Sequence, residues 1–250
     1  MKNNGLVWIT GASQGIGRAL AIELARRGKT VAASARNKEK LSALVQDAEQ
    51  LPGKIFTFSV DVTDQAAVEL TVDDIEKQLG GIDQAVLNAG TFLPMEGSEF
   101  RADVVRDHFE LNVMGVCYCI EPLVQRMSER GKGLIAINGS LAGYRGLPKS
   151  SAYGASKAAL INLAESLYLD LRKPGIDVKI INPGFVRTPL TDRNAFPMPF
   201  LTEAEKAASI IADGLSRKAF EIHFPVLFSS LMGFLRLLPN RFYLALAGKL

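Results

Sequence analysis

The chain has 250 residues, of which 48% are apolar and 22% are charged, and its formal net charge is +3. These values are typical of a globular domain and exclude a disordered chain. The small net charge, without any block of Lys or Arg, argues against nucleic acid as a partner. Cys117 and Cys119 lie two apart in an apolar run, where helical side chains point in different directions, so we expect core thiols and neither a disulfide nor a metal site.

Short apolar runs alternate with helix-like segments along the chain. The apolar runs predict strands at 6–9, 30–35, 54–60, 82–87, 133–138, 177–181 and 220–224. The segments between them predict helices at 16–27, 38–50, 64–79, 99–130, 151–173 and 202–217. Gly28 is expected to end the first helix and Asp64 to cap the third. This alternation predicts an α/β fold with a doubly wound, Rossmann-like parallel sheet of about seven strands and helices on both faces.

No repeat, low-complexity tract or linker divides the chain. We expect one catalytic domain over residues 1–225 and an apolar, basic tail over 226–250. Because the N-terminus leads directly into a strand-like run without a signal peptide, we expect a cytoplasmic protein.

The first turn, from Thr10 to Gly17, lies between an expected strand and an expected helix and reads T-G-A-S-Q-G-I-G. Glycines permit a tight turn and close backbone approach, and the helix N-terminus offers free N–H groups to a pyrophosphate. The spacing is G-x-x-x-G-x-G, not the commoner G-x-G-x-x-G. Together with the strand–helix alternation that follows, the turn predicts a dinucleotide site.

The end of the second strand indicates which dinucleotide is bound. A carboxylate there favours NAD, whereas an arginine accommodates the 2′-phosphate of NADP. The segment reads Ala33-Ser-Ala-Arg36 and contains no acid. Ser34 and Asn37 could add neutral hydrogen bonds, and Arg18 is either a second phosphate ligand or a surface charge. We therefore expect NADP in preference to NAD, although Arg36 could also be a solvated charge at a helix entry.

Tyr153 and Lys157 are four residues apart within the expected helix 151–173, so they lie on one helical face. A lysine at this distance would lower the pKa of the tyrosine and let it exchange a proton with a carbonyl or alcohol near neutral pH. Such pairs are also common without any catalytic role, so spacing alone does not decide between the two.

Further motifs occur at the ends of the later strands. They are Asp61-Val62 after the third strand, Asn88-Ala89-Gly90 after the fourth, Asn112 in the helix 99–130, Ser140 thirteen positions before Tyr153, and Pro183-Gly184 followed by Val186 and Thr188. In this order, with the glycine turn and Tyr153-x-x-x-Lys157, they resemble the short-chain dehydrogenase/reductase family in its compact branch. The resemblance covers residues 5–224. Leu87 replaces the first asparagine of the family's N-N-A-G, which affects packing beside the cofactor more than chemistry.

The resemblance implies a role for each catalytic residue. Tyr153 would be the general acid or base, Ser140 would orient the substrate oxygen, and Lys157 would lower the pKa of the tyrosine and bind the nicotinamide ribose. Asn112 would hold a water that links the lysine to solvent. Neither His108, expected at a helix surface or an interface, nor His223 has a place in this scheme.

The same resemblance implies which residues bind the cofactor. Asp61 would contact the adenine ring, and the segment after Pro183 would cover the nicotinamide. The expected set is Gly11, Ser13, Gln14, Gly15, Ile16, Gly17, Arg36, Asp61, Val62, Asn88, Ala89, Gly90, Tyr153, Lys157, Pro183, Gly184, Val186 and Thr188. A homodimer or homotetramer formed through the helices 99–130 and 151–173 is also expected from the family.

The segment 185–201 is expected to form a lid over the substrate. It contains Pro189, Phe196, Pro197, Met198, Pro199 and Phe200. With Leu141, Tyr144, Leu147 and the loop 92–95, it predicts an apolar pocket wall, which favours a hydrophobic ketone or alcohol over a sugar. Any lid needs apolar residues to close, so this pattern bears only weakly on the substrate.

The tail 226–250 is rich in Leu and Phe, carries Arg236, Arg241 and Lys249, and contains no acid. Its segment 231–238 has a helical pattern that Pro239 breaks, and it is too short to span a bilayer. Two interpretations stay open. The tail could lie in a membrane interface, at the inner face of the membrane, or it could pack over the active site or against a partner subunit.

The function that these features predict is hydride transfer between NADP and a carbonyl or secondary alcohol, in the direction of reduction of an apolar ketone. An alternative is an NADP-binding regulatory or scaffold protein that keeps the fold without turnover. Such a protein would be expected to have lost Tyr153, Lys157 or Ser140, and all three are present. An epimerase or dehydratase of the extended branch would carry a longer C-terminal domain and a differently spaced glycine turn.

Overall fold

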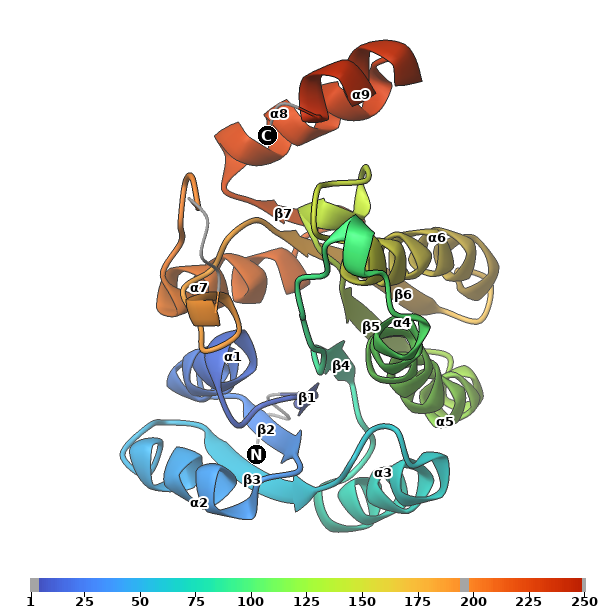
Figure 1. Ribbon diagram of the computed structural model, residues 1–250. Helices are drawn as coiled ribbons and strands as arrows, with labels where there is room; N and C mark the ends of the chain where they lie inside the picture. Colours follow the sequence, from blue (N-terminus) through green and yellow to red (C-terminus); the bar gives the residue numbers. More distant parts are fainter. Residues whose placement is uncertain (1–4, 194–197, 249–250) are drawn as a thin grey trace.

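A parallel β-sheet forms the centre of the computed structural model, which describes residues 5–193 and 198–248 (Figure 1). Its strands are β1 (Leu6–Thr10), β2 (Thr30–Ala35), β3 (Lys54–Ser59), β4 (Gln84–Leu87), β5 (Gly133–Asn138), β6 (Ile176–Pro183) and β7 (Glu221–Phe224). Within the described residues the seven strands lie in the order β3-β2-β1-β4-β5-β6-β7. Every neighbouring pair is parallel, which confirms the predicted fold class.

Helices cover both faces of this sheet. The helices α1 (Gly15–Arg26), α2 (Lys38–Asp47) and α7 (Ala204–Leu215) pack on one face, and α3 (Gln65–Leu79), α5 (Gly115–Arg130) and α6 (Ser151–Leu171) pack on the other. The central strands are buried on both sides, as in β1, where all five residues are buried, whereas the edge strand β3 is mostly exposed. Continuous apolar runs such as Leu6-Val-Trp-Ile9 therefore form central strands because neither face meets water.

Local sequence signals end the helices where they were expected to. Gly28 has φ +78°, the left-handed conformation that closes the turn after α1. Asp64 caps α3, since its Oδ1 accepts a hydrogen bond from Ala67 N at 3.0 Å. These two boundaries depend only on neighbouring residues, and both predictions are confirmed.

The single helix expected at 99–130 is wrong. The segment divides into α4 (Ala102–Phe109), a π-helical stretch at Glu110–Met114, and α5. The cause is long-range, because Asn112, at the centre of the π-helical stretch, bonds both backbone groups of Thr91 in another loop. Such stretches are frequent at functional sites.

The sheet reverses its strand order between β1 and β4. From β1 the chain moves outward through β2 and β3 and then returns to β4 on the other side of β1. The loops after β1 and β4 therefore diverge and leave a crevice at the carboxyl ends of the strands, the usual ligand position in such sheets. A cavity of about 380 Å³ lies there.

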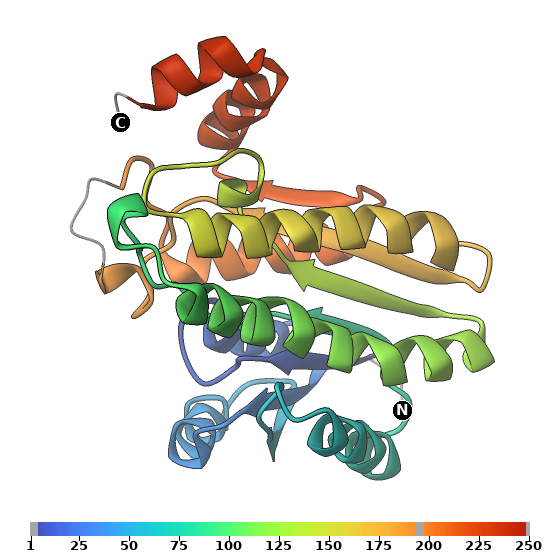
Figure 2. The same ribbon diagram turned by 45° about the vertical axis from the view of Figure 1, so that its right-hand side comes forward.

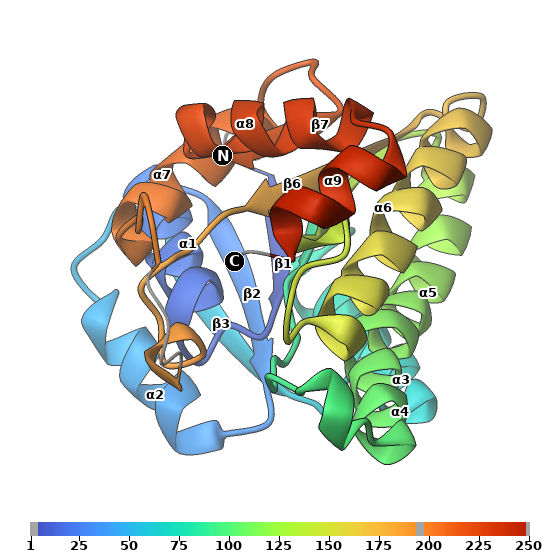
Figure 3. The same cartoon turned by 45° about the horizontal axis from the view of Figure 1, so that its top comes forward.

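After β7 the chain continues into two helices, α8 (Val226–Leu237) and α9 (Asn240–Ala247). Pro239 separates them, as the sequence predicts. Figures 2 and 3 show both helices outside the layers formed by the sheet and the other helices. In the part of the chain that the structure describes, no helix is long and apolar enough to cross a membrane.

Candidate active site

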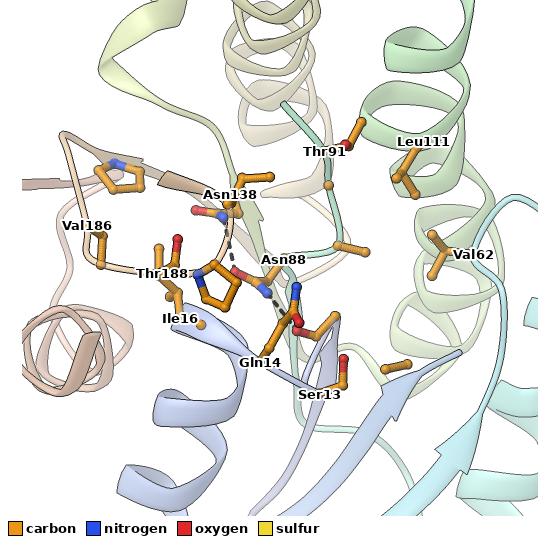
Figure 4. Close-up of a pocket in the computed structure, with 18 of the residues that line it drawn as sticks. Ser13, Gln14, Ile16, Val62, Asn88, Thr91, Leu111, Asn138, Val186 and Thr188 are labelled. Carbon is orange, nitrogen blue, oxygen red and sulfur yellow. Dashed lines mark hydrogen bonds between the residues drawn. The ribbon is translucent and has the colours of Figure 1, made fainter. Parts of the chain in front are cut away.

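The cavity brings together nearly all of the residues that the sequence singles out (Figure 4). The predicted residues that line it are Gly11, Ser13, Gln14, Gly15, Ile16, Arg36, Asp61, Val62, Asn88, Ala89, Gly90, Ser140, Tyr153, Lys157, Pro183, Gly184, Val186 and Thr188. Gly17 and Asn112 are not among the lining residues and lie behind the wall. The cavity is also lined by residues that the sequence did not predict as site residues, namely Lys40, Thr91, Leu111, Asn138, Leu190 and Thr191.

The glycine turn is shaped by close packing. A Cβ on Gly11 would lie 2.8 Å from Ala89 Cα, and one on Gly17 would lie 2.4 Å from Gly11 O. Gly11 and Gly15 also have positive φ, +67° and +57°. Gly11 and Gly15 therefore leave open backbone at the cavity, while Gly17 lets α1 start directly against the turn.

A polar network joins the ends of β1, β4 and β5 beneath this turn. Thr10 Oγ1 accepts the backbone N–H groups of Asn88 and Ala89, at 3.0 and 3.2 Å. The Asn88 amide donates to the carbonyls of Thr10 and Gly11 at 3.2 and 3.3 Å, and its Oδ1 accepts Asn138 Nδ2 at 3.1 Å (Figure 4). Leu87, which replaces the first asparagine of the family's N-N-A-G, is a core residue of β4. The hydrogen bonds of this network are therefore made by Asn88 and do not involve position 87.

The end of β2 is rich in cations. Arg36 extends into solvent with a side chain 70% exposed, and Lys40 Nζ donates to Gln14 Oε1 at 2.8 Å in the same corner of the cavity. Asp61 accepts the N–H and hydroxyl of Thr63 and faces Arg36 Nη1 at 3.5 Å. Burial alone would raise the pKa of Asp61, but the Thr63 hydrogen bonds and the charge of Arg36 together hold it below its usual value. Arg18 pairs with Asp47 instead and does not line this cavity.

Ser140 lies between β5 and a short helical turn, and its backbone is hydrogen-bonded to β6. Its N–H donates to Asn182 Oδ1 at 3.0 Å, and its Oγ accepts Ala142 N at 3.1 Å. Asn182 Nδ2 in turn donates to Glu221 Oε1 at 2.6 Å, and the Tyr144 hydroxyl donates to the same oxygen. Glu221 and Asn182 were not predictable from sequence, because β6 and β7 are distant in sequence from Ser140 and meet it only in the folded sheet.

Tyr153 and Lys157 lie on the cavity side of α6, with Lys157 Nζ 5.7 Å from the centre of the tyrosine ring. The ammonium donates to the carbonyl of Asn138 at 2.6 Å. The expected lowering of the tyrosine pKa is wrong: burial raises the pKa of Tyr153, and the hydrogen bond with Ser140 only opposes this. Burial also lowers the pKa of Lys157 to about 8. Desolvation therefore outweighs the attraction that the i, i+4 spacing suggests.

Asn112 is fully buried in the π-helical stretch. Its Oδ1 accepts Thr91 N at 2.7 Å, and its Nδ2 donates to Thr91 O at 3.1 Å and to Ser156 Oγ at 3.0 Å. A Cβ on Gly90 would lie 3.1 Å from Asn112 Oδ1, so glycine lets the loop approach this side chain without crowding. Asn112 thereby fixes the loop after β4 beside Tyr153 and Lys157.

His108 is not the surface or interface residue that we expected. It is fully buried, with Nε2 accepting Leu93 N at 3.1 Å and Nδ1 2.7 Å from Val104 O. It therefore holds the loop that carries Phe92, whose ring meets that of Tyr153 edge-on at 5.0 Å. Spacing gave no sign of this, since Leu93 lies fifteen residues away in another loop.

The substrate wall is only partly as expected. Leu141, Tyr144 and Leu147 do not line the cavity, and the hydroxyl of Tyr144 bonds Glu221, which makes its contact polar. The lid residues Phe196 and Pro197 lie outside the described residues.

The cysteines behave as core thiols: Cys119 is buried, Cys117 is half-buried, and burial raises both pKa values. The described residues contain no cluster of His, Cys, Asp and Glu suited to a metal ion.

Comparison with known proteins agrees with this geometry. Residues 5–196 match the sequence profile of the short chain dehydrogenases. The chain belongs to this family. Over 242 residues, 97% of this chain and 96% of the relative, it is 37% identical to an uncharacterized oxidoreductase of Myxococcus xanthus.

Two further similarities place the chain within the short-chain dehydrogenases. It is 35% identical over 193 residues to a 3beta-hydroxysteroid dehydrogenase of Mediterraneibacter gnavus, covering 76% of this chain and 69% of the relative. The crystal structure of a short-chain dehydrogenase from Streptomyces avermitilis has a TM-score of 0.84 and 28% identity, covering 98% of this chain and 97% of that one. The protein is thus an oxidoreductase of alcohol and carbonyl groups, in a family that uses nicotinamide cofactors.

The cavity fits such a cofactor. The cradle at Gly11 has no room for a side chain, as close approach of a pyrophosphate requires. Asn138 Oδ1 is buried and makes no hydrogen bond with any residue that the structure describes, so an acceptor is left at the cavity wall. Both features line the same cavity and meet through Asn88, which bonds the Gly11 carbonyl and the Asn138 amide.

Proposed function

We propose that this short-chain dehydrogenase is an NADPH-dependent reductase of an apolar ketone. The observation that carries the proposal is the gathering of Ser140, Tyr153 and Lys157 on one cavity whose far corner holds Arg36 and Lys40. The first group is suited to deliver a proton to a carbonyl, and the second is suited to a 2′-phosphate.

The cofactor preference is supported by the charges at the end of β2. The strand ends in Ser34 and Ala35, so β2 itself offers no carboxylate to a ribose 2′-hydroxyl, and the nearby Asp61 carboxylate faces Arg36. Arg36 meets Asp61 only at 3.5 Å with both side chains exposed, and such pairs contribute little energy. The guanidinium is therefore free to rotate toward a phosphate, with Lys40 as a second cation.

The proton chemistry follows from burial. Because burial raises the pKa of Tyr153, the phenol keeps its proton at neutral pH and can donate it to a substrate oxygen. Ser140 would hold that oxygen, since its backbone N–H is fixed on Asn182. Lys157, held on the Asn138 carbonyl, would bind ribose hydroxyls and supply a positive charge as the phenol loses its proton. We propose that Asn112 supports a water link from Lys157 to solvent. A bound nicotinamide supplies the hydride.

The substrate preference is supported by aromatic rings beside Tyr153 and in the segment proposed to cover the substrate. Phe92 packs against its ring, and Phe200 and Phe185 stack against Phe228 at 6.0 and 5.8 Å. The relative from Mediterraneibacter gnavus is named for a hydroxysteroid, an apolar alcohol, which agrees with this preference. We therefore propose bulky or long-chain apolar ketones as the substrate class.

We also propose a homodimer or homotetramer that pairs through α5 and α6. The supporting observations are Leu169, which is 72% exposed on α6, and Met114, which is 37% exposed just before α5. Light scattering of the purified protein, with Leu169→Asp as the variant, tests this: a smaller species in the variant supports the interface, and an unchanged mass contradicts it.

The function is tested by following NADPH and NADH oxidation with a panel of cyclic and long-chain ketones. Turnover of apolar ketones with NADPH, and much slower turnover with NADH, supports the proposal. Faster turnover with NADH contradicts the cofactor preference. Tight NADPH binding without turnover of any ketone in the panel would favour the regulatory or scaffold function instead.

A further inference from the structure

The hairpin of α8 and α9 exposes large apolar side chains to an extent unlike the rest of the chain. Val226, Leu227, Leu231, Phe234, Leu237 and Leu244 are between 49% and 80% exposed. We call these six residues the outer face. Leu227, Leu231 and Phe234 recur at i, i+4 and i+7, so they form one stripe along α8.

The opposite side of the hairpin is firmly attached to the rest of the protein. Met232 and Tyr243 are 4% and 2% exposed. Tyr243 donates its hydroxyl to Gly146 O at 2.7 Å, and the guanidinium of Arg145 lies 4.2 Å from the Tyr243 ring centre. Arg145 also donates to the carbonyl of Leu238 and to Asn240 Oδ1. The hairpin is thus held in one orientation, and its outer face is a fixed surface.

The charge of the hairpin indicates what the outer face meets. Residues 226–250 contain Arg236, Arg241 and Lys249 and no acid. Arg241 is exposed, with its guanidinium 4.5 Å from the centre of the exposed Phe242 ring. A second copy of the hairpin would place like charges against each other. Arg236 pairs with Glu165 of α6 at 3.8 Å, so Arg241 is the arginine that faces outward. An anionic surface would pair with Arg241 while it accepts the apolar side chains.

The length of the helices decides how they would meet such a surface. α8 has 12 residues and α9 has 8, whereas a span needs about 20. Short helices with an apolar face and adjacent basic residues lie in the plane of the interface. The outer face is therefore suited to rest on a bilayer and not to cross it.

The hairpin is also continuous with the active site. Phe228, in the first turn of α8, stacks on Phe185 and Phe200. A Cβ on Gly184, a residue that lines the cavity, would lie 2.9 Å from Phe228 Cδ1. A surface that binds the hairpin would thus lie beside the segment proposed to cover the substrate.

We propose that the outer face of α8 and α9 docks on an anionic lipid surface. Its apolar side chains enter the boundary between head groups and acyl chains, and Arg241 pairs with lipid phosphates. This places the reductase where apolar ketones concentrate. The docking goes beyond the proposed reaction and does not depend on it.

Vesicle flotation of the full-length protein tests the docking without any measurement of activity. The probes are vesicles of phosphatidylcholine alone and of an equimolar mixture with phosphatidylglycerol. We expect the protein to float with the mixed vesicles, to float less with phosphatidylcholine alone, and to lose part of its binding at high salt. The double variant Leu231→Ser, Phe234→Ser should lose at least about tenfold in binding, and Arg241→Ser about fivefold on the mixed vesicles alone.

Leu70→Ser is the matched control, because Leu70 is 65% exposed on α3, away from the hairpin. It should bind vesicles as the unmodified protein does, and circular dichroism should show all variants folded. Absence of flotation with mixed vesicles, or equal binding by the double variant, would overturn the proposal. So would light scattering in which the double variant becomes a smaller species, since the outer face would then be a subunit interface. Ketone reduction in solution is unaffected by each of these outcomes, so the two proposals fail separately.

Discussion

Polar groups are usually exposed and apolar groups usually buried, but two regions of this molecule depart from that distribution. The carboxyl edge of the sheet buries polar groups, and the C-terminal hairpin exposes apolar ones. At the sheet edge, Ser140, Lys157 and Asn112 are buried at 8%, 3% and 0% exposure. In the hairpin, Leu227 and Leu237 are exposed at 68% and 80%. Burial of polar groups costs free energy unless they are hydrogen-bonded, and exposed apolar surface invites association.

The two regions differ in whether their unusual side chains have partners within the chain. Each buried polar group named above bonds another part of the chain, as Asn112 does with Thr91, so the fold itself supports the sheet edge. The outer face of the hairpin has no such support from the described residues. The sheet edge is therefore organised for chemistry within the protein, and the hairpin for contact outside it.

The sharpest test of the sheet edge is Tyr153→Phe. Loss of the phenolic proton should lower kcat for ketone reduction by about 10²- to 10⁴-fold, because a positioned general acid contributes that much. Binding of NADPH, followed by fluorescence titration, should stay within about twofold, since the ring remains in place. A variant with comparable turnover would show that another group delivers the proton.

Burial of Lys157 predicts a pH-dependent stability. Its pKa falls from 10.5 to about 8 on folding, so between these values the unfolded chain holds more protons and stability rises with pH. The free energy of unfolding of the unmodified protein, minus that of Lys157→Met, should increase by about 2 to 3 kcal/mol between about pH 7 and 10. Urea denaturation of both proteins measures this, and a difference that is constant or falls with pH contradicts the burial.

The support behind Ser140 is tested at Glu221. Glu221→Leu leaves Asn182 Nδ2 and the Tyr144 hydroxyl unpaired, which should cost about 1 to 3 kcal/mol of stability and lower kcat more than it raises KM. Glu221→Gln keeps an acceptor oxygen and should recover most of both. If the two variants behave alike, Glu221 does not position Ser140.

Arg36 and Lys40, the two cations that line the cavity after β2, predict a smaller effect, which concerns the choice between NADPH and NADH. Arg36→Asp should shift the ratio of kcat/KM for NADPH to that for NADH by about tenfold or more toward NADH, because the carboxylate repels a 2′-phosphate and accepts a ribose hydroxyl. Lys40→Ala should move the ratio in the same direction but less. An unchanged ratio in both variants would mean that neither cation reads the 2′-phosphate.

The smallest effect is expected in the hairpin. Leu237→Ser removes a side chain that is 80% exposed, so the free energy of unfolding should change by no more than about 0.5 kcal/mol. Thermal unfolding measures this. A loss near that of a core substitution would show that the outer face packs against something in the purified protein, and would remove the contrast between the two regions.

The features that sequence predicted correctly depend on neighbours along the chain. Gly28 ends a helix, Asp64 caps one, and buried runs such as that of β1 become strands because these signals act over a few residues. The glycine turn and its cavity were also predictable, since a strand, a turn and a helix in succession determine where the turn lies.

The features that sequence missed depend on contacts between distant segments. The break at Asn112 requires Thr91, the burial of His108 requires Leu93, and the support of Ser140 requires Glu221. The error on Tyr153 has a related cause. The spacing to Lys157 was visible in the sequence, but the desolvation that raises the tyrosine pKa depends on how the whole fold encloses it.

The most direct test of the proposed function is the steady-state oxidation of NADPH by the purified protein with an apolar cyclic ketone, compared with Tyr153→Phe under the same conditions. The proposed chemistry predicts rapid turnover by the unmodified protein and a loss of at least about a hundredfold in the variant. Equal rates for the two proteins, or turnover with NADH alone, would contradict it.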